Sequence, residues 1–227
     1  MAGSGQEGAT LLLLPGNGGS ENDLLPLGRE LLPGRNLLIP RGMVLEYGMP
    51  RFLRRLAEGV FDEEDLKFRT EELAGFVEAA SKRYRLEPSK LLAVGLSNGA
   101  NIAASLLLSR PDLLRGAVLL RLMVPFEPEA PPVLSGVRVF VGAGELDHIV
   151  SKNTERLVEL LKEARAKAQV GWQRTGTAWP ERRPMRPNGG SLARSSPKRS
   201  ASGKRGSWTC RRRTAECLHG RRGVRTM

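Results

Sequence analysis

One serine stands in a pattern that is able to supply a nucleophile. Gly95-Leu96-Ser97-Asn98-Gly99 follows an apolar run, Leu91–Val94, and opens a helical pattern, Asn98–Leu108. Glycines on both sides let a chain turn sharply from strand into helix, which presents the serine hydroxyl at the helix N-terminus. We predict that Ser97 is a nucleophile. The alternative is an ordinary turn with a serine near a helix start.

A glycine-rich loop follows the first apolar run of the chain. Gly16-Asn17-Gly18-Gly19 comes directly after Thr10–Leu14 and Pro15. Glycines allow the backbone to approach a substrate oxygen closely, so the backbone N–H groups of Asn17 and Asn98 are the predicted oxyanion-hole donors. Taken alone, this segment is more typical of a plain glycine-rich loop.

A carboxylate follows a later strand, in the order serine, acid, base. Gly142-Ala143-Gly144-Glu145-Leu146-Asp147 comes straight after the apolar run Val137–Val141. We predict Asp147 as the acid that orients a general base, with Glu145 as the weaker candidate. The alternative is that both are solvated loop carboxylates.

The elements that must position these loops alternate along the chain. Short apolar runs closed by Gly or Pro are typical of strands buried on both faces, and they occur at Thr10–Leu14, Asn36–Ile39, Leu91–Val94, Ala117–Leu120 and Val137–Val141. Helical patterns lie between and after them, at Glu21–Leu32, Glu63–Tyr84, Asn98–Leu108 and Asn153–Ala168. The predicted fold is α/β, a doubly wound and mostly parallel sheet with helices on both faces.

Charge divides the chain into two parts. The 227 residues carry 36 Lys and Arg against 24 Asp and Glu, yet residues 1–165 are close to neutral, so the excess of positive charge falls in the remainder. Strand and helix patterns end at about the same place, and no strand or helix periodicity is evident from Gly171 on. We expect a hydrolase-like domain at 1–168 and a basic, low-complexity tail at 169–227 that lacks a packed core.

The first part resembles the phospholipase/carboxylesterase family of α/β-hydrolases, and within it the carboxylesterases associated with hydroquinone and quinone stress. The motifs that carry the resemblance are Gly16–Gly19 with Asp23–Leu27, Pro40–Gly42, Gly48–Phe52 with Arg54–Phe61, Gly95–Ala103, Met123–Pro125 and Gly142–Gly144 with Asp147. The resemblance implies hydrolysis of a small carboxylic ester through an acyl-enzyme on Ser97, with no metal and no organic cofactor. Met49, Phe52, Met123 and Val124 are the expected substrate-pocket residues.

The chain departs from this family at the general base. The family has a histidine after the last strand, whereas this chain has only His148, directly beside Asp147, and His219, far out in the tail. A general base must reach the serine hydroxyl, and neither histidine fits that role. We therefore expect the activity to be impaired. Pro15 is a second departure, because the family usually has His at that position.

The amino-acid sequence of the tail suggests why the general base is missing. The codons of Gly176-Thr177-Ala178-Trp179, read one base earlier, permit Gly-His-Gly-Leu, which is close to the family's motif. We hypothesise a frameshift near residues 164–171, in the gene or in its reported sequence, that replaced the last strand, the histidine and the last helix. Without its last strand, the sheet would expose the edge at Val137–Val141.

Other functions remain open at this stage. Basic pairs such as Lys198-Arg199 and Lys204-Arg205 would bind nucleic acid weakly and without specificity, which makes a non-catalytic protein with a nucleic-acid-binding tail the alternative function. Cys210, Cys217 and His219 match no usual zinc spacing. No apolar run is long enough for a signal peptide or a membrane span, so a cytoplasmic protein without membrane association is expected. The oligomeric state is left open, a homodimer included.

Overall fold

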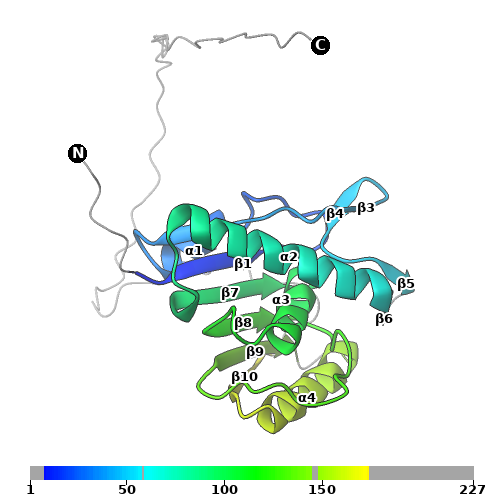
Figure 1. Cartoon of the computed structure of the whole chain (residues 1–227). Coiled ribbons are helices and arrows are strands. Elements are labelled where there is room, and N and C mark those ends of the chain that lie inside the picture. Colours follow the sequence, from blue (N-terminus) through cyan, green and yellow to red (C-terminus); the bar gives the residue numbers. More distant parts are fainter. Residues whose placement is uncertain (1–7, 58, 145–147, 174–227) are drawn as a thin grey trace, which may run out of the picture. The chain divides into compact units, whose positions relative to one another are not determined.

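Six parallel strands form the central sheet of this computed structural model, which describes residues 8–57, 59–144 and 148–173. The strand order is β10-β9-β8-β7-β1-β2, and every neighbouring pair is parallel (Figure 1). Their bounds are β1 Thr10–Leu14, β2 Asn36–Leu38, β7 Leu91–Leu96, β8 Gly116–Leu120, β9 Arg138–Gly144 and β10 Lys167–Gln173.

Four helices connect the strands: α1 Leu25–Leu31, α2 Glu63–Tyr84, α3 Asn98–Ser109 and α4 His148–Glu163, with a short 3-10 turn at Pro88–Lys90. The long helix α2 starts where predicted, because the Asp62 side chain accepts a hydrogen bond from the Asp65 N–H at 3.1 Å. It ends at Tyr84, and the following Arg85 has the left-handed conformation typical of helix ends. The first predicted helix is shorter than expected, since residues 21–24 form a turn before α1.

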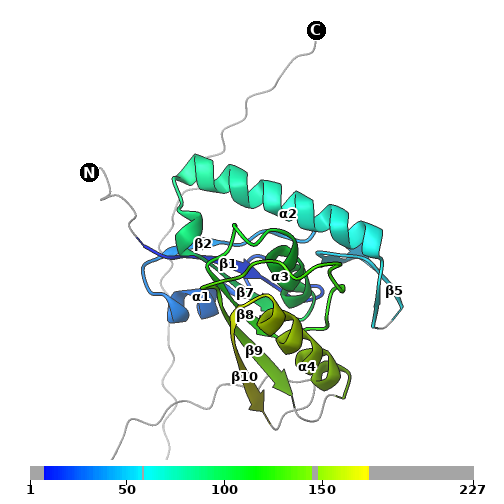
Figure 2. The ribbon, with the colours of Figure 1, turned by 60° about the horizontal axis from the view of Figure 1, so that its bottom comes forward.

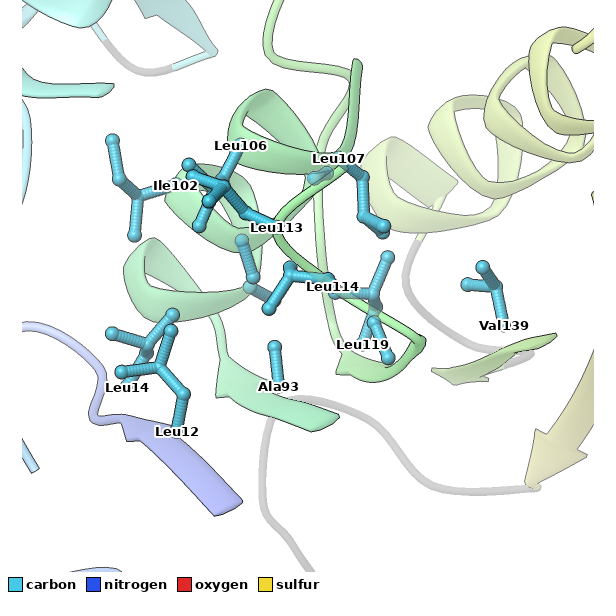
Figure 3. Close-up of a cluster of buried hydrophobic side chains, with 14 of the residues drawn as sticks. Leu12, Leu14, Ala93, Ile102, Leu106, Leu107, Leu113, Leu114, Leu119 and Val139 are labelled. Atoms are coloured by element: carbon cyan, nitrogen blue, oxygen red, sulfur yellow. The ribbon is translucent and has the colours of Figure 1, made fainter. Parts of the chain in front are cut away.

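Helices cover the two faces of the sheet unequally. Side chains of α2, α3 and α4 pack with alternate residues of the strands into one large core. Figure 3 shows its centre, where Ile102, Leu106 and Leu107 of α3 lie against Leu12 and Leu119 of the sheet. A second, smaller cluster on the other face contains Leu11, Leu13, Leu24 and Val94, with Leu27 of α1 packed on it. Figure 2 shows α1 and α2 on opposite sides of β1. The predicted doubly wound sheet is thereby confirmed.

Two small hairpins lie between β2 and α2, and the sequence analysis did not predict them. The strands β3 Val44–Glu46 and β4 Met49–Arg51 pair antiparallel, as do β5 Arg55–Ala57 and β6 Val60–Phe61. The turn between β3 and β4 has positive φ at both central residues, Tyr47 and Gly48, which is the geometry of the tightest hairpin turns.

The end of the sheet corrects one expectation. The predicted loss of the last strand is wrong for residues 167–173, because β10 pairs with β9 along its whole length and covers the β9 edge. Ala168 and Val170 pack on the core while Lys167 and Gln169 are exposed, so this strand has a two-residue alternation. The sequence analysis assigned these residues to the preceding helix and to the tail, because the run is short and polar.

The part of the chain that the structure describes has no helix long and apolar enough to cross a membrane. The predicted tail from residue 174 on, with Cys210, Cys217, His219 and the Gly176–Trp179 segment, lies outside the described residues.

Candidate active site

Ser97 occupies a sharp turn between β7 and α3. Its backbone has φ 52° and ψ −116°, a region that a non-glycine residue enters only at a cost of about 1–3 kcal/mol. The turn is held on both sides: the Ser97 N–H donates to the Leu120 carbonyl at 2.8 Å, and the Ser97 carbonyl accepts from the N–H groups of Ala100 and Asn101. This is the strained strand-to-helix geometry that the sequence motif predicts.

The glycines of the motif are required by close packing. A Cβ atom at Gly95 would lie 2.5 Å from the Gly99 carbonyl oxygen, and a Cβ atom at Gly99 would overlap the carbonyl oxygen of Leu14. No larger residue fits either place unless the backbone of β1 or α3 moves. The spacing Gly-x-Ser-x-Gly therefore reflects how tightly α3 lies against β1 and β7.

The glycine-rich loop after β1 lies beside the serine. A Cβ atom at Gly16 would be 3.6 Å from the Ser97 Cβ. The N–H groups of Gly18 and Gly19 are used within the protein, since they donate to Pro50 at 2.9 Å and to Gly16 at 3.1 Å. Within the described residues, the Asn17 N–H donates to no other group. The loop thus places a free backbone donor close to the turn that holds Ser97.

Asn98 joins the serine turn to the segment that follows β4. The residue is only 2% exposed, and its Oδ1 accepts a hydrogen bond from the Phe52 N–H at 2.7 Å. The amide Nδ2 is buried and has no partner among the described groups. Its backbone N–H lies in the first turn of α3, where helix N–H groups lack intrahelical acceptors.

Two more asparagines fix the loop after β8. Asn101 Oδ1 accepts from the Met123 N–H at 2.8 Å, and Asn153 Oδ1 accepts from the Val124 N–H at 2.9 Å. Sequence reasoning missed these side chains, although an asparagine inside an otherwise apolar helix such as α3 is itself a signal. The segment after β4 and the loop after β8 both carry predicted pocket residues. Each is therefore held by asparagine side chains from the helices α3 and α4.

The four predicted pocket residues differ in their exposure. Met49 is 47% exposed and its Sδ would be 3.5 Å from a Cβ at Gly18, beside the first loop. Met123 Cε would lie 3.7 Å from a Cβ atom at Gly59. Val124 lines a pocket of about 330 Å³ together with Val60, Phe61, Pro125 and Phe126. Phe52, in contrast, is 7% exposed and belongs to the hydrophobic core.

The side chains of the predicted acid and of both histidines lie outside the described part of the structure. Glu145 and Asp147 lie outside the described residues, directly after the end of β9 at Gly144. His148 is the first residue of α4, and His219 lies outside the described residues. In the ranges 8–57, 59–144 and 148–173, no group of three or more His, Cys, Asp or Glu is arranged to hold a metal ion.

Ion pairs near the site tie the loop after β8 to α4. Arg156 of α4 donates to Glu127 through Nε at 2.7 Å, and this hydrogen bond holds the pKa of the Glu127 carboxyl below its ordinary value. Asn153 and Arg156 thus anchor the same loop, at Val124 and at Glu127. The loop is fixed from its first residues to the wall of the pocket.

Comparison with known proteins gives this geometry a family. No protein-family model matches the chain. The chain is 50% identical over 167 residues to a Bacillus subtilis (strain 168) protein named "Putative hydrolase MhqD", covering 73% of this chain and 84% of that protein. The crystal structure of a Bacillus cereus carboxylesterase is 47% identical with a TM-score of 0.75, covering 77% of this chain and 83% of that one.

A more distant structure agrees. The carboxylesterase of Mesorhizobium loti is 30% identical with a TM-score of 0.72, covering 76% of this chain and 83% of that one. This chain belongs to the carboxylesterase family of the α/β-hydrolases, a family of ester hydrolases.

Proposed function

We propose that the chain is a serine carboxylesterase in which Ser97 carries the acyl group of a small ester. The observation that carries the proposal is the strained turn at Ser97, held between two obligate glycines and beside the Gly16 loop. Such a turn costs folding free energy, and it is the device that exposes a nucleophilic hydroxyl above a sheet.

The steps of the reaction follow from the groups around Ser97. The Ser97 hydroxyl attacks the ester carbonyl carbon, its proton passes to a base, and the alcohol leaves with a proton, so that an acyl-serine remains. Water then releases the carboxylic acid and restores the serine. The N–H groups of Asn17 and Asn98 would stabilise the oxyanion that forms in each step, since neither has a partner among the described groups.

The remaining roles are assigned by position. Asp147, directly after the described end of β9, is proposed as the acid that orients the base. Met49, Met123 and Val124 are proposed to contact the acyl or alcohol part of the substrate. Phe52 is buried, so its proposed role is to support that wall from behind.

We further propose that this particular chain is a weak catalyst because it lacks the family's histidine. Removal of a triad base in another serine hydrolase costs on the order of a millionfold in kcat. A frameshift after β10, which ends at Gln173, would account for the loss of the histidine without the loss of this strand. Sequencing the coding DNA for residues 164–179 tests it, because a frame without alternative Gly-His-Gly codons would refute it.

Hydrolysis of a short-chain p-nitrophenyl ester tests the function. We expect slow turnover by the chain, loss of that turnover in Ser97→Ala, and no change in Ser109→Ala, a control at the exposed end of the same helix. A frame-restored chain should be faster by about a thousandfold or more. Turnover that survives Ser97→Ala would contradict the proposed nucleophile, and fast turnover by the present chain would contradict the missing base.

The basic tail supports only a weaker second candidate, non-specific binding of nucleic acid. The excess of Lys and Arg over Asp and Glu falls after residue 165, and charge of this kind gives salt-sensitive attraction without sequence preference. A truncated chain ending at Gln173 should lose this binding. Retention of nucleic acid by that truncated chain would instead favour a binding function of the domain.

A further inference from the structure

A second pocket, apart from Ser97 and its loops, is lined by four arginines. It has a volume of about 390 Å³ and lies between the β3–β4 hairpin and α2. Arg51, Arg54 and Arg55 come from the hairpin segment and Arg69 from α2, whereas Glu46 is the acidic residue of the lining. Neither the serine turn nor the glycine-rich loop contributes to it.

The carboxylate of Glu46 is shared between two guanidinium groups. Arg51 donates to Glu46 Oε2 through Nη1, and Arg55 donates to Glu46 Oε1 through Nε at 3.1 Å. Among the described residues this leaves two positive charges facing one negative charge. The Arg51 side chain is only 4% exposed, and its Nε has no hydrogen-bond partner among the described groups. An incompletely paired buried cation is costly unless a further anion compensates it.

The other two arginines differ in their partners. Arg69 is satisfied from behind, by Asp65 at 3.3 Å and by Glu72 at 2.9 Å. Arg54 is 60% exposed and has Asp62 at 3.7 Å, a long ion pair that leaves its donors available. Arg54 and Arg55 are therefore the groups able to reach a ligand, while Arg51 adds a fixed charge beneath them.

The titration of Arg51 agrees with this balance. Burial lowers the pKa of Arg51 below its ordinary value, and the neighbouring charge of Arg55 lowers it further. The second cause is repulsion between two like charges, and a negative group in the pocket would shift the pKa in the opposite direction.

We propose that this pocket binds the oxyanion group of a small molecule, a carboxylate or a phosphate. Guanidinium groups bind such groups through paired N–H donors, and a volume of this size admits a small organic anion. The site is independent of the reaction at Ser97, so it provides the protein with a second ligand.

Calorimetric titration of the full chain with succinate, and separately with inorganic phosphate, tests the proposal. At about 0.15 M salt, interactions between distant surface charges are largely screened. We expect saturable binding of about one anion per chain, and an affinity at least about tenfold weaker in Arg55→Gln, which removes a charge-assisted hydrogen bond. The arm that binds identifies the chemistry as carboxylate or phosphate.

Arg110→Gln is the matched control, because Arg110 is also a partly exposed arginine among carboxylates, those of Glu71, Glu78 and Asp112. It should leave the affinity unchanged within about twofold. If Arg55→Gln does not unfold cooperatively, the more exposed Arg54→Gln takes its place. Absence of saturable binding for both anions, or equal binding in the pocket variants and the control, would overturn the proposal. Weak, multiple binding by the basic tail would be the same in all variants.

Discussion

The two faces of the central sheet differ in how completely helices cover them. On the face of α2, α3 and α4, residues such as Leu12, Leu106 and Leu119 are fully buried. On the other face, α1 packs near β1, whereas Phe140 of β9 is 40% exposed. A groove of about 660 Å³ crosses that face and is lined by residues of β1, β7, β8, β9 and β10. The covered face therefore carries most of the buried apolar surface.

The candidate active site belongs to the covered face. Ser97 leads directly into α3, whose residues 98–108 are all buried. A hydrogen bond of 2.7 Å between Thr70 and Ser105 joins α2 to α3 inside this layer. The geometry of the serine turn thus depends on the packing of α3 on the covered face.

The largest predicted effect is a difference in the free energy of unfolding between two variants, each of which shortens one side chain on one face of the sheet. Leu106→Ala should lower the free energy of unfolding by about 3–5 kcal/mol, because it leaves a cavity among fully buried side chains. Phe140→Ala should cost less than about 2 kcal/mol, because the ring is already 40% exposed. Urea unfolding of both variants measures the two values. Equal losses would contradict the difference between the faces.

A pair of helix glycines gives the next largest effect. A Cβ atom at Gly28 of α1 would lie 2.6 Å from Leu13 Cδ1, whereas a Cβ atom at Gly75 of α2 would contact nothing within 4 Å. Gly28→Ala should therefore destabilise the protein by about 1–3 kcal/mol through overpacking. Gly75→Ala, the matched control, should stabilise it by about 0.5–1 kcal/mol through helix propensity.

Thermal unfolding of the two glycine variants distinguishes close packing from loose packing of α1. A neutral Gly28→Ala would mean that α1 moves away from the sheet at little cost. The smaller apolar cluster would then contribute little to stability, and the contrast between the faces would be sharper than the contacts suggest.

The parts of the fold that were predicted correctly follow from local patterns. The continuous apolar run Thr10–Leu14 predicts β1 with its bounds, and the helical period of Glu63–Tyr84 predicts α2 with its bounds. The β3–β4 and β5–β6 hairpins were missed because their strands have two or three residues and include Pro50. Pairing of such short strands depends on contacts with the rest of the molecule.

The candidate site likewise has one part that the sequence predicts and another that depends on residues far apart in the chain. The Ser97 turn was predicted from the motif together with its place between an apolar run and a helical pattern, although the contact that excludes a side chain at Gly99 is with the distant Leu14. The amide side chains of Asn98, Asn101 and Asn153 were missed, because their partners lie 22 to 46 residues away. The roles of Asp147 and of the backbone donors stay predictions.

The smallest predicted effect concerns charge on the open face. Lys167 of β10 lies opposite Arg138 of β9, and both residues are exposed. Like charges directly opposite each other on neighbouring strands destabilise a sheet. Lys167→Glu should therefore stabilise the protein by about 0.2–1 kcal/mol, and less at high salt because the pair is screened.

Lys167→Gln separates the two contributions, since it removes the repulsion without adding an attraction. We expect its effect to lie between those of the parent chain and Lys167→Glu, as measured by urea unfolding at low and at high salt. A loss of more than about 1 kcal/mol in Lys167→Glu would mean that this carboxylate is buried on the open face. Some other part of the protein would then have to cover β9 and β10, and the two faces would be more alike than the described residues show.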